Sequence, residues 1–282
     1  MTVGTLKAAV ERCAKQLYPV QVQIKEALRK SPVLHVDETG LYVMGKRMWL
    51  HTTVTPNLTL YAVHAKRGGE ALCAIGVLAD YAGVAVHDGW GAYWQFLCDH
   101  ALCNVHHLRE LLFVQQQEGQ TWANKMSTLL LSMKDAVKQA REQGLTCLTQ
   151  AALTQWKSEY QTLLQEGWQA NPLDPPPVAG KAKRGRPKQS AARNLWHRLT
   201  NYQDAVLRFS EDFRVPCDNS QAERDIRMVK VQQKISRCFR SLAGAQAFCC
   251  LRGYISTLRK QHGQLLTALQ LALAGHPVSP AF

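Results

Sequence analysis

Three short runs of β-branched and aromatic residues follow one another closely between residues 33 and 65. They read VLHVDETGLYV, RMWLHTTV and LTLYAVHA, and the turn-forming stretches MGK and TPN separate them. Runs of this kind joined by short turns are typical of hairpins, so they predict three antiparallel strands. A helical segment around residues 70–81 and a fourth strand, GVAVHD, follow. The first third of the chain is therefore expected to build a sheet.

Helical periodicity dominates the rest of the chain. One apolar stripe runs from Trp122 to Val137, and another runs from Leu153 to Leu164. The Pro/Gly-rich basic stretch that follows cannot continue either helix. Helical pattern returns at residues 195–207 and again from residue 220 to the end of the sequence. Ahead of the first strand, the sequence predicts one or two short helices broken by Pro19.

This order of elements predicts an α/β fold, in which a mixed sheet with flanking helices carries an α-helical insertion. We expect an N-terminal helical segment at residues 1–30 and the first part of the core at 31–115. The insertion is expected at 116–208 and would contain the basic loop at 171–194. The last part of the core, at 209–282, would carry the C-terminal helices.

The charge balance restricts the partners of the chain. The sequence has 34 Lys and Arg against 21 Asp and Glu, a net charge of +13. This excess favours a polyanion, with nucleic acid ahead of a membrane surface, while a basic protein without a special partner stays an alternative. No apolar run approaches the ~18 residues of a membrane span, and no secretory signal is visible. Nine irregularly spaced cysteines fit reduced thiols in a cytoplasm.

Two aspartates lie at or near the ends of predicted strands. Asp37 lies inside an apolar run, where a charge is costly unless it is paired or binds a metal. Asp88 closes the apolar run VAVHD just before Gly89. Strand-end carboxylates can converge on one spot of a sheet, where they must bind a proton or a cation, and their hard oxygens favour Mg²⁺ or Mn²⁺. Each aspartate taken singly also fits a turn.

Glu223 has both a structural and a functional interpretation. The sequence SQAE, which begins at Ser220, matches a capping box in which Ser220 caps the helix and Glu223 reaches back. At about 100° per residue, however, Glu223 heads a narrow cationic face with apolar residues on both sides. That face carries Arg227, Lys230 and Lys234. It suits a half-buried helix facing a phosphate chain, and a solvated basic face is the alternative.

Four segments of the chain resemble the transposases of the insertion-sequence sixty-six (IS66) family. They read HVDETGLYVMGKRMWLHTTVT, HDGWGAYW, HALCNVHHLREL and DNSQAERDIRMVKVQQKISRCFRSLAGAQAFC. The resemblance extends from about residue 5 to 275. These enzymes are DDE transposases with a ribonuclease H-like core. The resemblance implies that Asp37, Asp88 and Glu223 are the catalytic and metal-binding triad, and that Glu38 is a neighbour rather than a ligand.

The resemblance also implies a reaction, cofactors and partners. Two divalent ions, Mg²⁺ or Mn²⁺, about 3.5–4 Å apart would activate a water or a 3′-hydroxyl and stabilise the leaving oxygen. The ends of the element would be cut first, and the freed 3′-hydroxyl would then attack target DNA. Implied partners are element and target DNA, accessory proteins of the same element and further copies of the chain on DNA. The implied location is the bacterial cytoplasm, in association with the nucleoid.

The remaining polar clusters have weaker signals. The stretch CDHALCNVHH lacks the spacing of a zinc finger, so a short element with partly buried Cys and His is the preferred interpretation. The resemblance matches Cys103, His106 and Arg109, which gives them a possible auxiliary role at the active site or on DNA. The basic segment KAKRGRPK can bind DNA phosphates or enter a minor groove, with a solvated linker as the alternative. The expected DNA-binding surface comprises Lys181, Lys183, Arg184, Arg186, Lys188, Arg227, Lys230 and Lys234.

Departures from the family pattern keep two alternatives open. Full-length members carry an N-terminal extension with a cysteine-rich zinc module, whereas this sequence begins almost at the catalytic core. The chain could therefore be a truncated, non-transposing remnant that binds DNA, or a ribonuclease H-like nuclease or resolvase that cuts without joining. The family also favours Asn at the position of Ser220 and Gly at that of Arg237.

Overall fold

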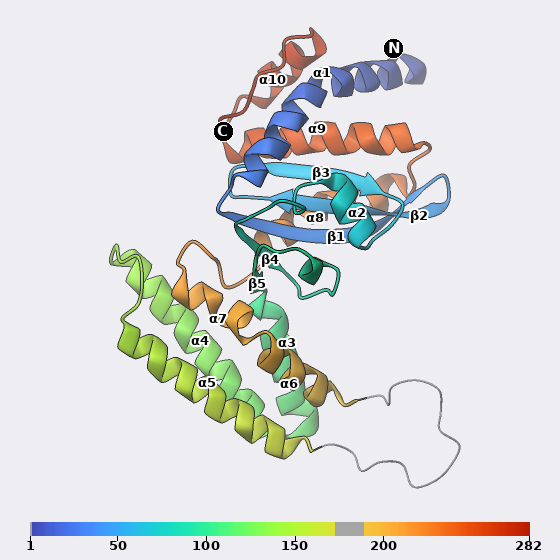
Figure 1. Ribbon diagram of the computed structural model, residues 1–282. Coiled ribbons are helices and arrows are strands. Elements are labelled where there is room, and N and C mark those ends of the chain that lie inside the picture. The colour runs from blue at the N-terminus through green and yellow to red at the C-terminus, as the bar shows by residue number, and fades with distance from the viewer. Residues whose placement is uncertain (1, 173–188) are drawn as a thin grey trace, which may run out of the picture. The chain divides into compact units, whose positions relative to one another are not determined.

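A five-stranded mixed sheet forms the centre of the N-terminal part of the chain in the computed structural model (Figure 1), which describes residues 2–172 and 189–282. The order across the sheet is β3-β2-β1-β4-β5, with β1–β2 and β2–β3 antiparallel and β1–β4 parallel. The strands are β1 (Val33–Val43), β2 (Lys46–Val54), β3 (Thr59–His64), β4 (Val84–His87) and β5 (Asp99–Leu102). The mixed sheet and its three antiparallel strands confirm the prediction, whereas β5 was not predicted.

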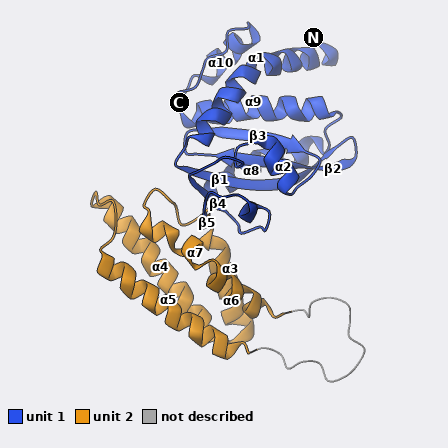
Figure 2. Cartoon of the chain, in the orientation of Figure 1, with its two compact units in different colours: residues 1–100, 219–282 blue, residues 101–218 orange. Residues whose placement is uncertain are grey.

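The chain divides into two compact units (Figure 2). Unit 1 comprises residues 1–100 and 219–282, and unit 2 comprises residues 101–218. The boundary falls inside β5, so unit 1 contains β1 to β4 with their three pairings and the helices that pack on them. Its helices are α1 (Val3–Arg29), α2 (Gly69–Ile75), the short 3₁₀ turn η1 (Tyr93–Gln95), α8 (Ser220–Ser236), α9 (Leu242–Lys260) and α10 (Leu265–Leu273).

Pro19 does not break the first helix, which corrects the prediction. α1 continues from Val3 to Arg29 with Pro19 inside it. In Figure 1 the helix changes direction part-way along its length, as expected where proline removes a backbone donor. The stripe of buried side chains continues on both sides of Pro19, from Cys13 to Leu28, so tertiary packing outweighs the local penalty.

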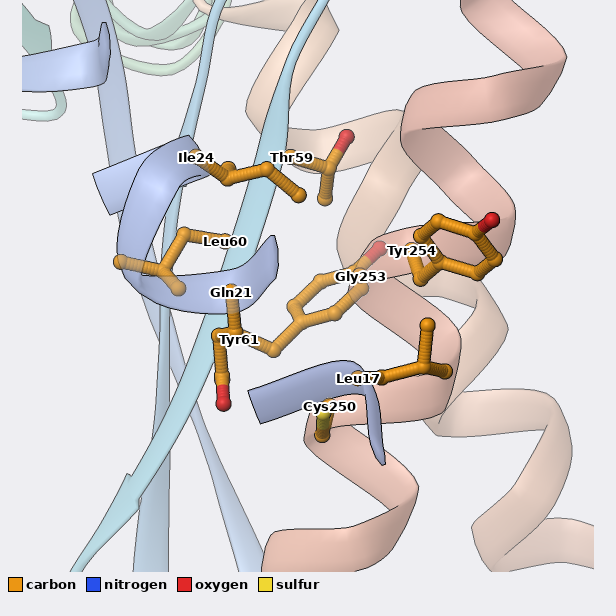
Figure 3. Close-up of a pocket in the computed structure, with 9 residues that line it drawn as sticks. All are labelled: Leu17, Gln21, Ile24, Thr59, Leu60, Tyr61, Cys250, Gly253 and Tyr254. Carbon is orange, nitrogen blue, oxygen red and sulfur yellow. The ribbon is translucent and has the colours of Figure 1, made fainter. Parts of the chain in front are cut away.

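Two apolar clusters hold unit 1 together. In the larger cluster, Leu17 and Ile24 of α1 meet Tyr254 and Leu258 of α9 and the strand residues beneath them. Figure 3 shows where α1, β3 and α9 come together. α9 crosses β3 so closely that a Cβ on Gly253 would lie 3.1 Å from a backbone oxygen of the strand, which is tighter than an ordinary van der Waals contact.

The second cluster packs α8 against the sheet. Val229 of α8 contacts a group of buried side chains from three strands and α9: Leu41, Val43, Leu50, Tyr61, Ala245 and Cys249. Since Leu41 and Val43 alternate with residues on the opposite face of β1, α8 covers the face on which the odd-numbered residues of β1 lie.

Unit 2 is helical within the residues that the structure describes. Its helices are α3 (Asn104–Glu118), α4 (Thr121–Glu142), α5 (Gln150–Ala170), α6 (Ala191–Asn201) and α7 (Gln203–Glu211). The stripe from Trp122 to Val137 is buried, as its period predicts. The expected helix at residues 195–207 is instead two helices, α6 and α7, which meet at Tyr202. Of the helices described, none is long and apolar enough to span a membrane.

Candidate active site

Adjacent acidic residues on β1 point to opposite faces of the sheet. Side chains alternate along a strand, so Asp37 shares a face with Leu41 and Val43, the residues that α8 covers. Glu38 lies on the other face, where its carboxylate accepts hydrogen bonds from Arg67 and Tyr93. Asp37 therefore lies on the face of β1 that α8 covers, whereas the carboxylate of Glu38 lies on the opposite face and is already paired.

Asp88 follows the strand that runs parallel to β1. The last registered pair between β1 and β4 is His35 with Val86, and Asp37 and Asp88 each lie two residues further along. Neighbouring strands are ~4.8 Å apart, so this register brings the two aspartates to the same level and the same face of the sheet. Asp88 is exposed, and its Oδ1 accepts a hydrogen bond of 2.8 Å from the backbone N–H of Trp90. The predicted turn role is therefore also present.

Glu223 lies in the first turn of α8 and is half-buried. The N-cap position belongs to Asn219, whose side chain makes no capping hydrogen bond. Ser220 is the first helical residue, so the capping box that the sequence predicts is out of register by one residue. The side chain of Asn219 does not cap the helix, because it bonds to β1 instead.

Asn219 fastens the start of α8 to β1. Its side-chain nitrogen donates a hydrogen bond of 2.9 Å to the backbone oxygen of Val36, and its oxygen lies 3.0 Å from Nδ1 of His35. Both partners directly precede Asp37, and Asn219 is 2% exposed. These two hydrogen bonds therefore position the start of α8, which carries Glu223, beside β1. Its sequence position gives no signal of this role, because the partners lie more than 180 residues away.

A largely buried ion pair also holds α8 in place. The ammonium group of Lys260 on α9 lies 2.7 Å from the carboxylate of Asp225 and donates to the backbone oxygens of Thr55 and Leu58. Tyr61 donates a hydrogen bond of 2.9 Å to the backbone oxygen of Asp225. Nearly two turns beyond Asn219, at Asp225, the helix is thus tied to β3 and α9.

The pKa of Asp37 depends on the charges of Asp88 and Glu223. Burial raises the pKa of Asp37 to about 7, against a hydrogen bond from the backbone N–H of Glu38 that lowers it. The negative charges of Glu38, Asp88 and Glu223 raise the pKa further. Two residues far along the chain therefore contribute to one negative field at Asp37.

Glu38 is neutralised differently. Its side chain is 2% exposed, and Arg67 donates two hydrogen bonds to Oε1, at 2.9 and 2.6 Å. Tyr93 donates a bond of 2.5 Å to Oε2. Burial raises the pKa of Glu38, while these two partners lower it. The guanidinium of Arg67 also stacks on Trp49 and Trp90.

The predicted basic residues fall into two groups. Arg227, Lys230 and Lys234 are exposed on α8, as a DNA-binding face requires. The loop residues Lys181, Lys183, Arg184, Arg186 and Lys188 lie outside the described residues. The two apolar flanks of this basic face differ in exposure. Ile226 and Val229 on one flank are buried, whereas Ile235 on the other flank is exposed.

The candidate auxiliary residues belong to unit 2. Cys103 is the buried N-cap residue of α3, His106 is half-buried in its first turn, and Arg109 is exposed. Cys98 is buried as well, which agrees with the preferred interpretation of this stretch. A role for Cys103, His106 or Arg109 in catalysis or DNA binding stays a prediction.

Comparison with known families decides the identity of the chain. The model of the family described as "Transposase IS66 family" matches residues 1–247. The chain belongs to the IS66 transposase family. No curated protein matches it. Membership implies that this IS66 transposase binds DNA, and it suggests dependence on a divalent metal ion.

The residues on the α8 face fit such an ion. Carboxylate oxygens are the ligands that Mg²⁺ and Mn²⁺ prefer. Burial is the largest cause of the raised pKa of Asp37, and the nearby charges of Glu38, Asp88 and Glu223 add to it, so the ionised form of Asp37 lacks compensation. A divalent cation would remove that imbalance, whereas Glu38, with its own cation at 2.6 Å, does not need one.

Proposed function

We propose that this IS66 transposase cuts and joins DNA with Asp37, Asp88 and Glu223 as its catalytic and metal-binding triad. The proposal includes a ribonuclease H-like core, which the mixed sheet and the register of Asp37 with Asp88 support. Unit 2 lies in the sequence between Asp88 and Glu223, where the resemblance implies a helical insertion.

The observation that carries this proposal is the raised pKa of Asp37. A value of about 7 results from burial together with the charges of neighbouring carboxylates, among them Asp88 and Glu223. Strongly perturbed acids of this kind cluster at functional sites. Three turn or cap residues at separate places would not influence one another in this way.

The residues of the chain have distinct roles in this proposal. The triad would hold divalent cations, Mg²⁺ or Mn²⁺, which would activate the attacking oxygen and stabilise the leaving oxygen at a scissile phosphate. Asn219 positions the helix that carries Glu223, and Arg67 keeps Glu38 paired on the opposite face of β1. Arg227, Lys230 and Lys234 bind DNA phosphates and orient the duplex.

Nicking of a supercoiled plasmid tests the proposal. In Mg²⁺ the parent protein is expected to nick the plasmid. The nicking rate of Asp88→Asn is expected to be at least about 100-fold lower, because the change removes a metal ligand itself and not only a residue that orients a ligand. Asp135→Asn, an exposed residue of α4, is the matched control and should nick like the parent. Equal rates for the parent and Asp88→Asn would refute the triad.

A joining assay separates the proposed transposase from the two alternatives. A labelled duplex with a free 3′-hydroxyl is incubated with a target plasmid, and covalent joining is measured. Joined product supports strand transfer. Nicking without joining would identify a nuclease or resolvase, and DNA binding with neither activity would identify a non-transposing remnant.

A further inference from the structure

Two separate segments of this transposase contain no acidic residue. Neither Asp nor Glu occurs between residues 39 and 69, and neither occurs between residue 226 and the end of the sequence. Lysine and arginine recur in both segments. Wherever these segments come to the surface together, the surface carries positive charge without local compensation.

The structure brings the two segments together at one end of the sheet. The tip of the β1–β2 hairpin pairs with the connection from α8 to α9 through a bridge between Val43 and Phe239. Met44 donates a backbone hydrogen bond of 2.8 Å to Phe239, and Phe239 donates one of 2.9 Å to Tyr42. In Figure 1 the β1–β2 turn and the α8–α9 connection lie at the same end of the sheet.

The joined surface is fixed in shape. Met44 and Gly45 both have positive φ, 51° and 74°, as in the tight two-residue turns of hairpins. Gln233 of α8 donates a bond of 2.8 Å to the backbone oxygen of Gly40, which attaches the helix to the middle of β1. The hairpin tip therefore projects beside the C-terminal end of α8 as a firm ridge.

Basic side chains cover this ridge. We name as the hairpin edge the exposed residues Lys46, Lys230, Lys234, Arg237 and Arg240; Lys46 pairs with Val43, whose side of β1 faces α8. No carboxylate forms an ion pair with them anywhere in the described part of the chain. Five uncompensated cations on a rigid ridge fit a regular line of phosphates, since duplex DNA carries a charge every ~1.7 Å of its axis.

The length of α8 sets the distance between the hairpin edge and the triad. Arg237 follows Glu223 by fourteen residues along α8 and its C-cap, which at 1.5 Å per residue is about 21 Å. At 3.4 Å per base pair, that distance spans about six base pairs. A duplex held by both ends of α8 would place its reacting phosphate at Glu223 and its flank at the hairpin edge.

We propose that the hairpin edge binds the phosphate backbone of duplex DNA about six base pairs from the bond at the triad, an inference that rests on the proposed function. It adds Lys46 of the hairpin, with Arg237 and Arg240 beyond α8, to the basic residues already predicted on the helix. The hairpin edge holds the duplex, whereas the triad reacts with it.

The test compares two variants of the full chain with equal changes in charge. Lys46→Glu with Arg240→Glu reverses two charges on the hairpin edge. Arg12→Glu with Lys15→Glu reverses two exposed charges on α1 and is the control. Affinity for a 30-base-pair duplex is measured in EDTA between 50 and 200 mM salt, and circular dichroism confirms that both variants fold.

The hairpin edge variant is expected to bind about 10–100-fold more weakly at 100 mM salt, with a salt slope smaller by about 1.8, because two phosphate contacts are lost. The control is expected to bind within about threefold of the parent. Hydroxyl-radical footprinting of the parent should show protection about six base pairs from the nicked bond, and the hairpin edge variant should lose it.

Equal affinity and equal footprints for the two variants would overturn the inference while leaving nicking by the parent intact. A parent that neither binds nor nicks DNA would instead overturn the proposed function. An anionic membrane has the same charge, so binding to vesicles with 30% phosphatidylserine is measured too. Loss of vesicle binding with unchanged DNA binding would also refute the inference.

Discussion

Asn219 and His35 lie 184 residues apart in the sequence, and their side chains meet at 3.0 Å inside unit 1. The amide oxygen of Asn219 faces Nδ1 of His35, so that this ring nitrogen carries the proton. The amide nitrogen of Asn219 binds the backbone of Val36. The strand that carries Asp37 and the helix that carries Glu223 are thus joined close to both carboxylates. The joined residues lie one and two positions before Asp37 and four positions before Glu223.

Replacing Asn219 should therefore affect both stability and cleavage. Asn219→Ala leaves a buried backbone oxygen and a buried imidazole without their partner, so we expect a loss of about 2–3 kcal/mol in the free energy of unfolding. Plasmid nicking per folded molecule should fall as well, because Glu223 is no longer held in position. Urea denaturation and the nicking assay measure the two effects.

Asn171→Ala provides the control for this change. Asn171 is a buried Asn of unit 2, bonded to Gln120 and to the backbone of Gly167. It should lose stability without losing nicking per folded molecule. Equal loss of nicking in both variants would show that Asn219 acts through stability alone.

Arg67 should stabilise the fold chiefly through Glu38. Arg67→Ala leaves the carboxylate of Glu38 buried without its cation, although Arg67 itself is partly exposed, and we expect a loss of about 2 kcal/mol. Glu38→Gln in the Arg67→Ala background should recover part of that loss, since it removes the unpaired charge. Urea denaturation of the four proteins in the cycle checks this, and strictly additive effects would contradict the pairing.

The raised pKa of Asp37 predicts how stability depends on pH without metal. The value is about 7 in the folded protein and ~4 in the unfolded chain. Between these values the native state binds more protons, so ionisation of Asp37 lowers the free energy of unfolding as pH rises from about 4 to about 7. Asp37→Asn should therefore be more stable than the parent at pH 8, by up to about 4 kcal/mol, and similar to it near pH 4.

Urea denaturation in EDTA at several pH values measures this difference. Buried His51, with its pKa lowered to about 4, makes the fold less stable in acid, but both proteins contain it and the effect cancels. Added Mg²⁺ should reduce the advantage of Asp37→Asn at pH 8, because only the parent has the full ligand set. A difference that is independent of pH would contradict the electrostatic explanation.

Arg237 adopts a backbone conformation that favours glycine. Its φ is 55° and its ψ is −69°, and Cys238 donates a bond of 2.7 Å to the backbone oxygen of Ser236 across it, which is a tight γ-turn. Arg237→Gly should raise the free energy of unfolding by about 0.5–1 kcal/mol by relieving this strain. Arg240→Gly, where φ is not positive, should lower it. Thermal unfolding of both variants tests the difference, and the opposite order would contradict it.

The sequence allowed much of the fold to be predicted, and the failures have physical causes. The strands β1, β2 and β4 have clear β-branched residues, whereas β5, with the sequence DHAL, has none. Pro19 predicted a helix break, but contacts with α9 and α10 stabilise a continuous α1. In each case, long-range packing outweighed the local preference.

The candidate site was predictable only in its acidic residues. Asp88 lies just beyond the end of β4, as predicted, whereas Asp37 lies inside β1 rather than near its end, because the strand continues to Val43. The residues that position them have no such signal: Asn219 looks like a turn residue, and Arg67 lies in a polar loop. Their roles depend on partners that only the folded chain brings close, and a single sequence contains no record of those contacts.

Binding of Mn²⁺ tests most directly whether Asp37, Asp88 and Glu223 form one metal site. Free and bound Mn²⁺ are counted by electron paramagnetic resonance at pH 8 in the parent, in Asp88→Asn, in Glu223→Gln and in the control Asp135→Asn. The parent and the control should bind two ions per chain, and each triad variant should lose affinity by at least about tenfold for one of them. Identical binding curves for all four proteins would contradict a shared site.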